Sequence, residues 1–445
     1  MITAAHPVDA PLSPGRMAAE ALQHVLVMYG NAMVLPLVVG GALKLPRDQV
    51  ALLASTGLVA SGLATLIQSV GLWRFGIRMP IVMGLSLASL APIASLSAAG
   101  ATIAGFFGAT IAAGVFAIAA APFASRLVRY FPPVVTGSIV IVIGITLLRT
   151  GIDASSTLGA KSFGDPENLA VAALVLATIL VARKVFDGVV ASLAVLIGLV
   201  VGYFGAIALG SVEFGVVRDA SWLALVQPFS FGAPAFEPAT VASLCVVSLV
   251  VMIESAGMFL GLGDICGRVV GRPEVARGLA GTGLGTVIAG VLGAFPLVPL
   301  AQNVGLVALS EIRSRWAAAA AGAMLLALGI VPKLGALAAS LPSSVTGAAA
   351  LVLFGLVAAT GVRILARAEL RSRENLIVIA LTLTAGMIPW MAPTFFAVAP
   401  KWSAPVFNSG ITLAAVTAVL LNVLFNGADA SSSAGSPLRS AETEP

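Results

Sequence analysis

Charged residues are scarce in this sequence. Asp, Glu, Lys and Arg make up 10% of its 445 residues, whereas hydrophobic residues make up 59%. Ordinary soluble proteins are roughly a quarter charged, so this chain has too little polar surface to cover the outside of a water-soluble fold. The mean hydropathy of +1.06 agrees with that reasoning. The composition therefore excludes a soluble globular protein and predicts an integral membrane protein surrounded by the lipid bilayer.

Cysteine and histidine are also rare, with two residues of each. Cys245 and Cys266 flank or lie within one apolar segment, a placement that provides neither a disulfide framework nor the spacing of metal ligands. The sequence also lacks a Gly-rich phosphate loop and a Ser-His-Asp pattern. We therefore expect no metal, no cofactor and no enzymatic activity.

Basic residues outnumber acidic ones, and the net charge is +5. Because the basic residues stand singly in short loops between apolar runs, they do not predict a nucleic-acid partner. Most of the 24 Lys and Arg residues fall in loops on the same side as the N-terminus. By the positive-inside rule, this bias predicts a multi-pass protein of the inner membrane with both termini in the cytoplasm.

Apolar runs long enough to cross a bilayer, about 20 residues each, recur along the chain. We predict fourteen membrane-spanning segments of an all-α protein, in two sets of seven separated by a polar stretch near 212–236. The first set lies near 17–43, 49–72, 78–99, 101–125, 131–150, 167–184 and 187–211, and the second near 237–263, 276–294, 296–311, 314–336, 340–366, 374–393 and 403–426. Residues 1–16 are expected to form a cytoplasmic tail, and 427–445 a disordered one.

Two local matches indicate an internal repeat. Pro132-Pro133-Val134-Val135-Thr136-Gly137 recurs as Pro342-Ser343-Ser344-Val345-Thr346-Gly347, and Met79-Pro80-Ile81-Val82 recurs as Phe295-Pro296-Leu297-Val298. Each pair of motifs opens the same segment of the two sets. Because a set of seven helices reverses the direction of the chain, the two halves would be inverted repeats.

The third segment of each half is predicted to be interrupted. Pro80 with Gly84, and Pro296 with Pro299, prevent a regular helix at the start of these segments, which leaves a short extended stretch before a half-helix near Ser86 or Asn303. Unpaired backbone at this depth is tolerated only inside protein or beside a cavity. Paired interrupted segments in inverted halves therefore predict a substrate site; the alternative is a pair of buried proline kinks.

Glu254 is the only carboxylate deep inside an apolar run. A charged acid is costly there, so this group is suited to carry a proton and to accept a hydrogen bond from a ligand. The alternative is a structural acid paired with a neighbouring helix. His24 lies early in the first segment with Asn31, and both a packing role and ligand contact stay open for it.

The sequence Ala301-Gln302-Asn303-Val304-Gly305 places two amides at the start of the second half-helix. An amide offers both a donor and an acceptor. This pairing suits the alternating edge of a heterocyclic base better than it suits an anion or a sugar.

Together these motifs resemble the nucleobase/ascorbate transporters, also called nucleobase cation symporters of class two. The resemblance rests on Gln23-His24, Arg78-Met79-Pro80, Glu254, and Phe295-Pro296 followed by Gln302-Asn303-Val304-Gly305, and covers nearly the whole membrane region. It implies seven plus seven inverted repeats with a core domain (17–125 and 237–336) and a gate domain (131–211 and 340–426). It also implies a homodimer, an elevator-like movement of core against gate, and uptake of a nucleobase coupled to a cation, with the proton expected.

The resemblance also implies the residues that bind substrate. Glu254 matches the base-binding carboxylate of the eighth helix, and it is the expected proton-coupling residue. Gln302 matches the residue that hydrogen-bonds the base. The other residues expected around the substrate are Ala301, Asn303, Gly305, Ser86, Leu87, His24, Asn31 and Met258. Methionine at position 258 resembles the urate-type members.

Three departures from the family pattern affect the substrate and the coupling. Leu87 stands where relatives carry an aromatic residue that packs on the base. Thr282 stands where many relatives have an aspartate, and the signature ends in Ser310 and Glu311 instead of a threonine and a small or basic residue.

We therefore predict proton-coupled uptake of a purine-type base, urate or xanthine. A carrier of uracil or another small heterocycle is the alternative within transport. An anion transporter on a related fold, and a receptor that has lost transport, are the alternatives outside it.

Overall fold

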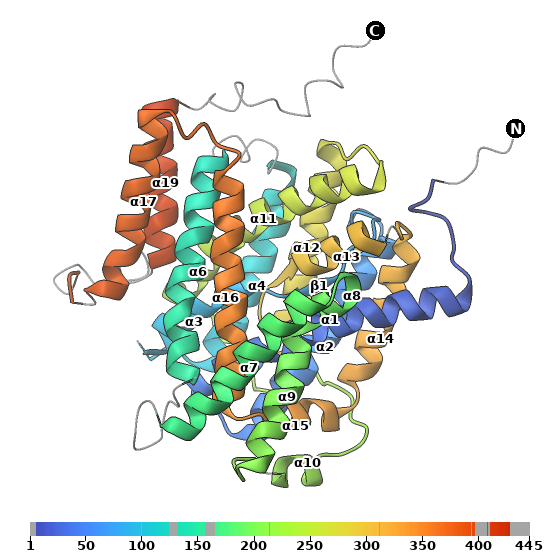
Figure 1. Cartoon of the computed structure of the whole chain (residues 1–445). Coiled ribbons are helices and arrows are strands. Elements are labelled where there is room, and N and C mark those ends of the chain that lie inside the picture. The colour runs from blue at the N-terminus through green and yellow to red at the C-terminus, as the bar shows by residue number, and fades with distance from the viewer. Residues whose placement is uncertain are drawn as a thin grey trace, which may run out of the picture.

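The computed structural model describes residues 6–98, 100–123, 132–155, 165–212, 214–310, 312–392, 394–396, 407 and 410–427. Helices form almost all of the regular structure in these residues, together with one pair of short strands (Figure 1). The first half contains α1 (Pro14–Ala42), α2 (Arg47–Val70), β1 (Met83–Leu85), η1 (Leu87–Ser89), α3 (Leu90–Ala98), α4 (Ile103–Ala120), η2 (Ala121–Phe123), α6 (Pro133–Ser155), α7 (Pro166–Val185), α8 (Gly188–Ser192) and α9 (Ala194–Ala208). The second contains α10 (Gly215–Asp219), α11 (Pro238–Cys266), α12 (Arg272–Leu292), β2 (Leu297–Pro299), α13 (Ala301–Ser310), α14 (Arg315–Gly329), α15 (Pro332–Ala339), α16 (Ser343–Leu365), α17 (Arg373–Met391) and α19 (Gly410–Asn426).

Eight helices of the described chain are long and apolar enough to cross a membrane, and four shorter apolar helices accompany them. This confirms the coarse prediction of a mostly helical chain with many apolar segments. The count of fourteen spans stays a prediction. Two expected spans differ in form: the run near 187–211 is divided into α8 and α9, and the run near 314–336 into α14 and α15. In the second case Pro332 supplies the reason, because proline has no N–H to continue the helix.

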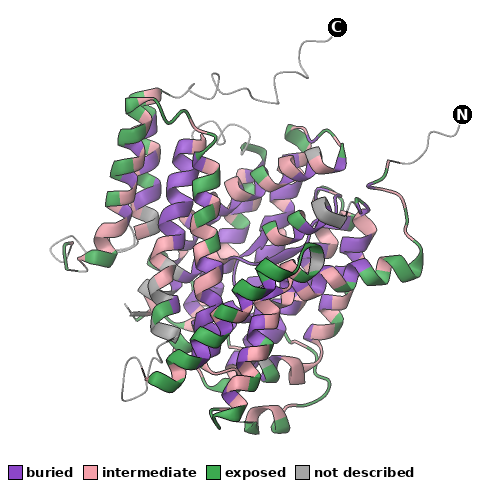
Figure 2. Cartoon of the chain, viewed as in Figure 1, coloured by how far each residue is buried: buried purple, intermediate pink, exposed green. Residues whose placement is uncertain are grey.

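The outer helices carry apolar side chains on their exposed faces. Leu420 and Leu424 on α19 and Leu180 on α7 are at least 64% exposed, and Figure 2 shows exposed residues along these helices while buried residues concentrate in the interior. Exposed leucines at this density would be unfavourable in water, but they suit a surface that faces lipid.

The two strands lie in the interior and pair with each other. They are antiparallel, with Met83 opposite Pro299 and Leu85 opposite Leu297. Beyond the ladder, the N–H of Ser86 donates to Pro296 O (2.8 Å) and the N–H of Leu300 donates to Val82 O (3.0 Å). The prolines prevent helix in both stretches, and the pairing supplies the backbone bonds that apolar surroundings require.

Each strand is followed by a helix, so the two segments have the same form. After β1 the chain continues into η1 and α3, and after β2 it continues into α13. The second helix begins at Ala301, two residues before the predicted start at Asn303. Gly84 allows the close approach of the strands, because a Cβ there would lie 2.7 Å from the side chain of Leu300.

Residues 6–12, which we call the N-terminal strap, lie across the ends of several helices. Asp9 forms ion pairs with Arg268 (3.3 Å) and Arg315 (2.8 Å). Trp316 Nε1 donates to Asp9 O, and Arg315 N donates to the carbonyl of Val8, whose side chain is fully buried. The strap therefore joins the end of α11 to the start of α14.

Candidate functional site

A cavity of about 90 Å³ lies where the two strands give way to their helices. One wall comes from β1, η1, β2 and α13, and α11 contributes Glu254 and Met258. The opposite wall comes from α6 and α16. Ligand sites usually have volumes of roughly 300–1,000 Å³, so this cavity holds little besides a compact ligand in its present form.

Glu254 lies in the middle of α11, and its side chain faces this cavity. Within the described part of the chain, no side chain or backbone group forms a hydrogen bond or ion pair with its carboxyl group. The alternative of a structural acid paired with a neighbouring helix therefore finds no partner among these residues. A half-buried carboxyl group without a partner retains its full capacity to bind a ligand.

Gln302 and Ala301 open α13 on the same cavity. The first N–H groups of a helix have no partner within the helix, and those of Ala301 and Gln302 donate to no carbonyl in the described chain. The side-chain amide of Gln302 adds one more donor and an acceptor. This end of the cavity therefore offers donors to a polar ligand edge.

Ser86 and Leu87 line the cavity from the first half of the chain. Ser86 is buried, and its hydroxyl group has no hydrogen-bond partner among the described residues. Met258, one turn after Glu254, also lines the cavity. Six of the predicted residues are thus brought together: Glu254, Met258, Ala301, Gln302, Ser86 and Leu87.

Three of the other four predicted residues, His24, Asn303 and Gly305, do not line the cavity. His24 and Asn303 are both buried and bind each other: Asn303 Nδ2 lies 3.0 Å from His24 Nδ1 and donates to His24 O at 3.0 Å. This pair joins α1 to α13. Gly305 is exposed on α13, and the side chain of Asn31 lies outside the described residues, as do the side chains of Ser310 and Glu311.

The apolar wall opposite Glu254 was not predicted. It consists of Val140 and Ile143 on α6 with Leu353, Leu356, Val357 and Thr360 on α16. A signal for it was present, because the repeated Val-Thr-Gly motifs lie at the starts of α6 and α16. These helices cross closely where Gly144 meets Ala358: a Cβ at Gly144 would be 2.4 Å from the backbone N of Ala358.

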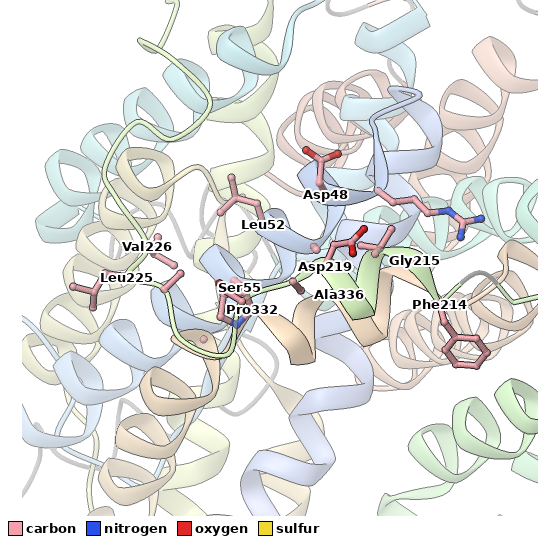
Figure 3. A pocket seen from close by; sticks show the side chains of 17 residues that line it. Asp48, Leu52, Ser55, Phe214, Gly215, Asp219, Leu225, Val226, Pro332 and Ala336 are labelled. Atoms are coloured by element: carbon pink, nitrogen blue, oxygen red, sulfur yellow. The ribbon is translucent and has the colours of Figure 1, made fainter.

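A second and larger cavity, of about 890 Å³, lies elsewhere, between the start of α2, α10 with the chain that follows it, and α15 (Figure 3). Arg47, Asp48 and Asp219 bring both signs of charge to its walls, and all three are exposed. It contains none of the predicted site residues. Size alone would select this cavity, whereas unpaired buried polar groups select the smaller one.

An interior cavity between the broken segments of a helical membrane chain is characteristic of a membrane permease. The model of the Permease family, the xanthine and uracil permeases, matches residues 16–395. The chain belongs to this family, that of the nucleobase/ascorbate transporters. As predicted, the family and its members are permeases and not enzymes.

Curated relatives match over nearly their whole length. The chain is 41% identical to the uric acid transporter UacT of Escherichia coli (strain K12) over 424 residues, which cover 94% of this chain and 88% of the relative. It is 37% identical to the uric acid permease PucK of Bacillus subtilis (strain 168), covering 91% and 94% of the two chains. The xanthine permease of the same organism is 35% identical, with 93% and 94% covered.

Solved structures with low sequence identity share the fold. The transmembrane domain of the cyanobacterial bicarbonate transporter BicA has a TM-score of 0.61 at 15% identity, covering 94% of this chain and all of that one. The murine anion transporter Slc26a9 in its inward-facing state has a TM-score of 0.63 at 12% identity, covering 94% and 69%. These likenesses concern the arrangement of the helices alone.

Proposed function

We propose that this chain is a secondary active transporter that takes up a purine-type nucleobase, urate or xanthine. The observation that carries the proposal is that Glu254 and Gln302 line one cavity with side chains that have no polar partner among the described residues. A purine edge alternates N–H donors with carbonyl and ring-nitrogen acceptors, so a carboxyl group and an amide complement it. The names of the relatives, uric acid and xanthine permeases, support the same substrate class.

Proton coupling is part of the proposal, with Glu254 as the coupling residue. A carboxyl group in an apolar helix is costly to keep charged, so binding a proton and binding the base are linked at one side chain. Thr282, on α12, brings no second acid to the interior. We therefore propose one carboxyl group that both holds the base and carries the proton.

The two walls of the cavity support an elevator-like movement. The polar wall belongs to segments of the proposed core domain, 17–125 and 237–336, and the apolar wall belongs to α6 and α16 of the proposed gate domain, 131–211 and 340–426. A largely apolar wall binds the base weakly and can slide past the occupied site. Since about 90 Å³ leaves little free space, relative movement of these walls would open the site.

The setting we propose is the inner membrane, with both termini in the cytoplasm, fourteen spans as inverted repeats, and a homodimer. One pair of equivalent hydrogen bonds supports the repeat. The hydroxyl group of Thr65 accepts a bond from the N–H of Met83, which begins β1, and that of Thr286 accepts one from the N–H of Leu297, which begins β2. A uracil-type carrier is the second candidate, since Leu87 offers no aromatic face to a large base. An anion carrier is less favoured, because the bicarbonate and anion transporters of similar fold share only 15% and 12% identity with this chain, whereas the uric acid transporter shares 41%.

Uptake of radiolabelled urate and xanthine tests the proposal, in cells that lack their own base carriers, with and without a protonophore. We expect saturable uptake of one of these bases, which falls to background when the proton gradient is dissipated. Competition by unlabelled uracil and purines separates the two nucleobase candidates. Expressed protein that moves neither purine would contradict the substrate class, and uptake insensitive to the protonophore would contradict proton coupling.

A further inference from the structure

The two strands are connected to the preceding helix by chains of different length. The first residue of each strand donates its N–H to a threonine on the preceding helix: Met83 to Thr65, and Leu297 to Thr286. Met83 follows Thr65 by 18 positions, whereas Leu297 follows Thr286 by 11. The first connection therefore contains seven more residues than the second. A longer connection has more conformational freedom, so it needs additional contacts to hold its strand in one register.

Gln68 on α2 supplies such contacts to the longer connection. Its Oε1 accepts a bond from the N–H of Ile77 (3.0 Å), and its backbone carbonyl accepts one from Arg78 (2.7 Å). Its Nε2 donates to two groups on α12, the carbonyl of Gly278 (2.8 Å) and Oγ1 of Thr282 (3.0 Å). One fully buried side chain thus fixes the connection to helices from both halves.

The equivalent residue of the second half lacks this function. Gln68 lies three residues after Thr65, and the residue three after Thr286 is Ala289. The backbone carbonyl of Ala289 accepts a bond from Ala294 (2.7 Å), just as that of Gln68 accepts one from Arg78. The backbone role is therefore the same in both halves. Only the side-chain role is added in the first half, where the connection is longer.

The backbone around Gln68 is packed too closely to adopt another arrangement easily. Gly76 donates its N–H to Arg277 O (2.9 Å) and has φ of +93°, a conformation that favours glycine. A Cβ at Gly281 of α12 would lie 2.8 Å from the N of Gly76 and 3.1 Å from the side-chain amide of Gln68. The connection is therefore confined between α2 and α12.

We propose that Gln68, with Thr282 as its partner, is a positioning residue for the substrate cavity. The connection that it holds leads into β1, and the register of β1 with β2 sets Ser86 and Leu87 relative to Ala301 and Gln302. Among the described residues, Gln68 forms no hydrogen bond with a residue that lines the cavity, so it acts through this register. In this proposal Thr282 is the neutral group that accepts a hydrogen bond from Gln68. The effect on transport rests on the proposed function, whereas the effect on the connection does not.

Gln68→Ala and Thr282→Val test the proposal by uptake kinetics. Both changes remove one partner of a buried hydrogen bond that holds the register of β1, so we expect KM for urate or xanthine to rise about tenfold, which corresponds to about 1.4 kcal/mol. The maximal rate per transporter should change less, because Glu254 is intact. Thr282→Ser keeps the hydroxyl group and should retain the wild-type KM.

Thr110→Val is the matched control, because Thr110 is also fully buried, but within the described part of the chain its hydroxyl group bonds only Phe106 O of its own helix. Hydrogen exchange of peptides covering 71–86 supplies a readout that needs no substrate. We expect these peptides to exchange faster in Gln68→Ala and Thr282→Val than in the wild type. In Thr110→Val they should exchange at the wild-type rate. If the variants exchange faster but the wild-type protein transports no purine, the proposed substrate is wrong and the positioning role stands. Wild-type KM and wild-type exchange in folded Thr282→Val would overturn the positioning role.

Discussion

Polar groups in the cavity and polar groups at the edges of the helical assembly differ in their hydrogen bonding. The carboxyl group of Glu254 and the hydroxyl group of Ser86 have no partner in the described chain. Asp9 in the N-terminal strap has two ion pairs, and Glu237, just before α11, accepts bonds from Thr102 and Thr240 (2.9 Å each). Paired groups hold elements together, whereas unpaired ones in a cavity remain available to a ligand. This difference separates the acids that hold elements together from the acid that we propose to bind substrate.

The largest expected effect tests this difference directly. Glu254→Gln should reduce uptake of urate or xanthine at least about a hundredfold, because it removes the proposed charge-assisted bond to the base and the proposed proton carrier. Glu237→Gln is the matched control, since its carboxylate is already satisfied by two threonines, and it should keep uptake within about twofold. Radiolabelled uptake, normalised to the amount of protein in the membrane, measures both. Normal uptake by Glu254→Gln would remove the basis of the proposed site.

A second, smaller loss is expected for Gln302→Ala. This change deletes one neutral donor and acceptor while the N–H groups of the α13 start remain, so KM should rise roughly tenfold. Gln227→Ala, on the exposed chain after α10, should leave KM unchanged. Thermal unfolding should be the same for both variants, because the amide of Gln302 bonds nothing in the described chain. A marked fall in stability with unchanged KM would assign Gln302 to structure instead.

The opposite pattern is expected for Asp9→Asn in the strap. Both ion pairs of Asp9 are partly exposed, so we expect the stability to fall by about 1 kcal/mol and KM to remain at its wild-type value. Thermal unfolding in detergent at two salt concentrations measures the stability, and radiolabelled uptake measures KM. Asp187→Asn, at an exposed acid without an ion pair in the described chain, serves as the control. If KM moved and stability did not, the strap would belong to the transport mechanism.

The smallest effect concerns the residue that departs from the family pattern. Leu87→Phe would restore an aromatic side chain to the edge of the cavity, and an aromatic contact contributes about 0.5–1.5 kcal/mol beyond its buried area. We expect KM for the purine to fall about threefold, with less change for uracil. A competition panel of unlabelled bases measures both. An equal or higher KM would indicate that the small cavity has no room for the added ring.

Much of the site was predictable because its signals are local. A carboxylate inside an apolar run, prolines that prevent a helix, and two adjacent amides can each be recognised without knowledge of the neighbouring helices. Six predicted residues line one cavity for this reason. The pairing of His24 with Asn303 was not predictable, because it depends on the relative rotation of α1 and α13. In helices that are apolar on all sides, the spacing of residues carries little information about which face points inward.

The sequence by itself determined that this protein lies in a membrane, which segments cannot be regular helices, and which carboxylate lies deep inside an apolar run. Composition and proline placement have these consequences in any arrangement of the helices. Only the tertiary structure decided that β1 pairs with β2, that α6 and α16 close the cavity, and that Gln68 holds the longer connection. Each of these depends on contacts between segments up to more than 200 residues apart, such as the bond from Gln68 to Thr282. Packing selects those contacts, and no local pattern in the chain specifies them.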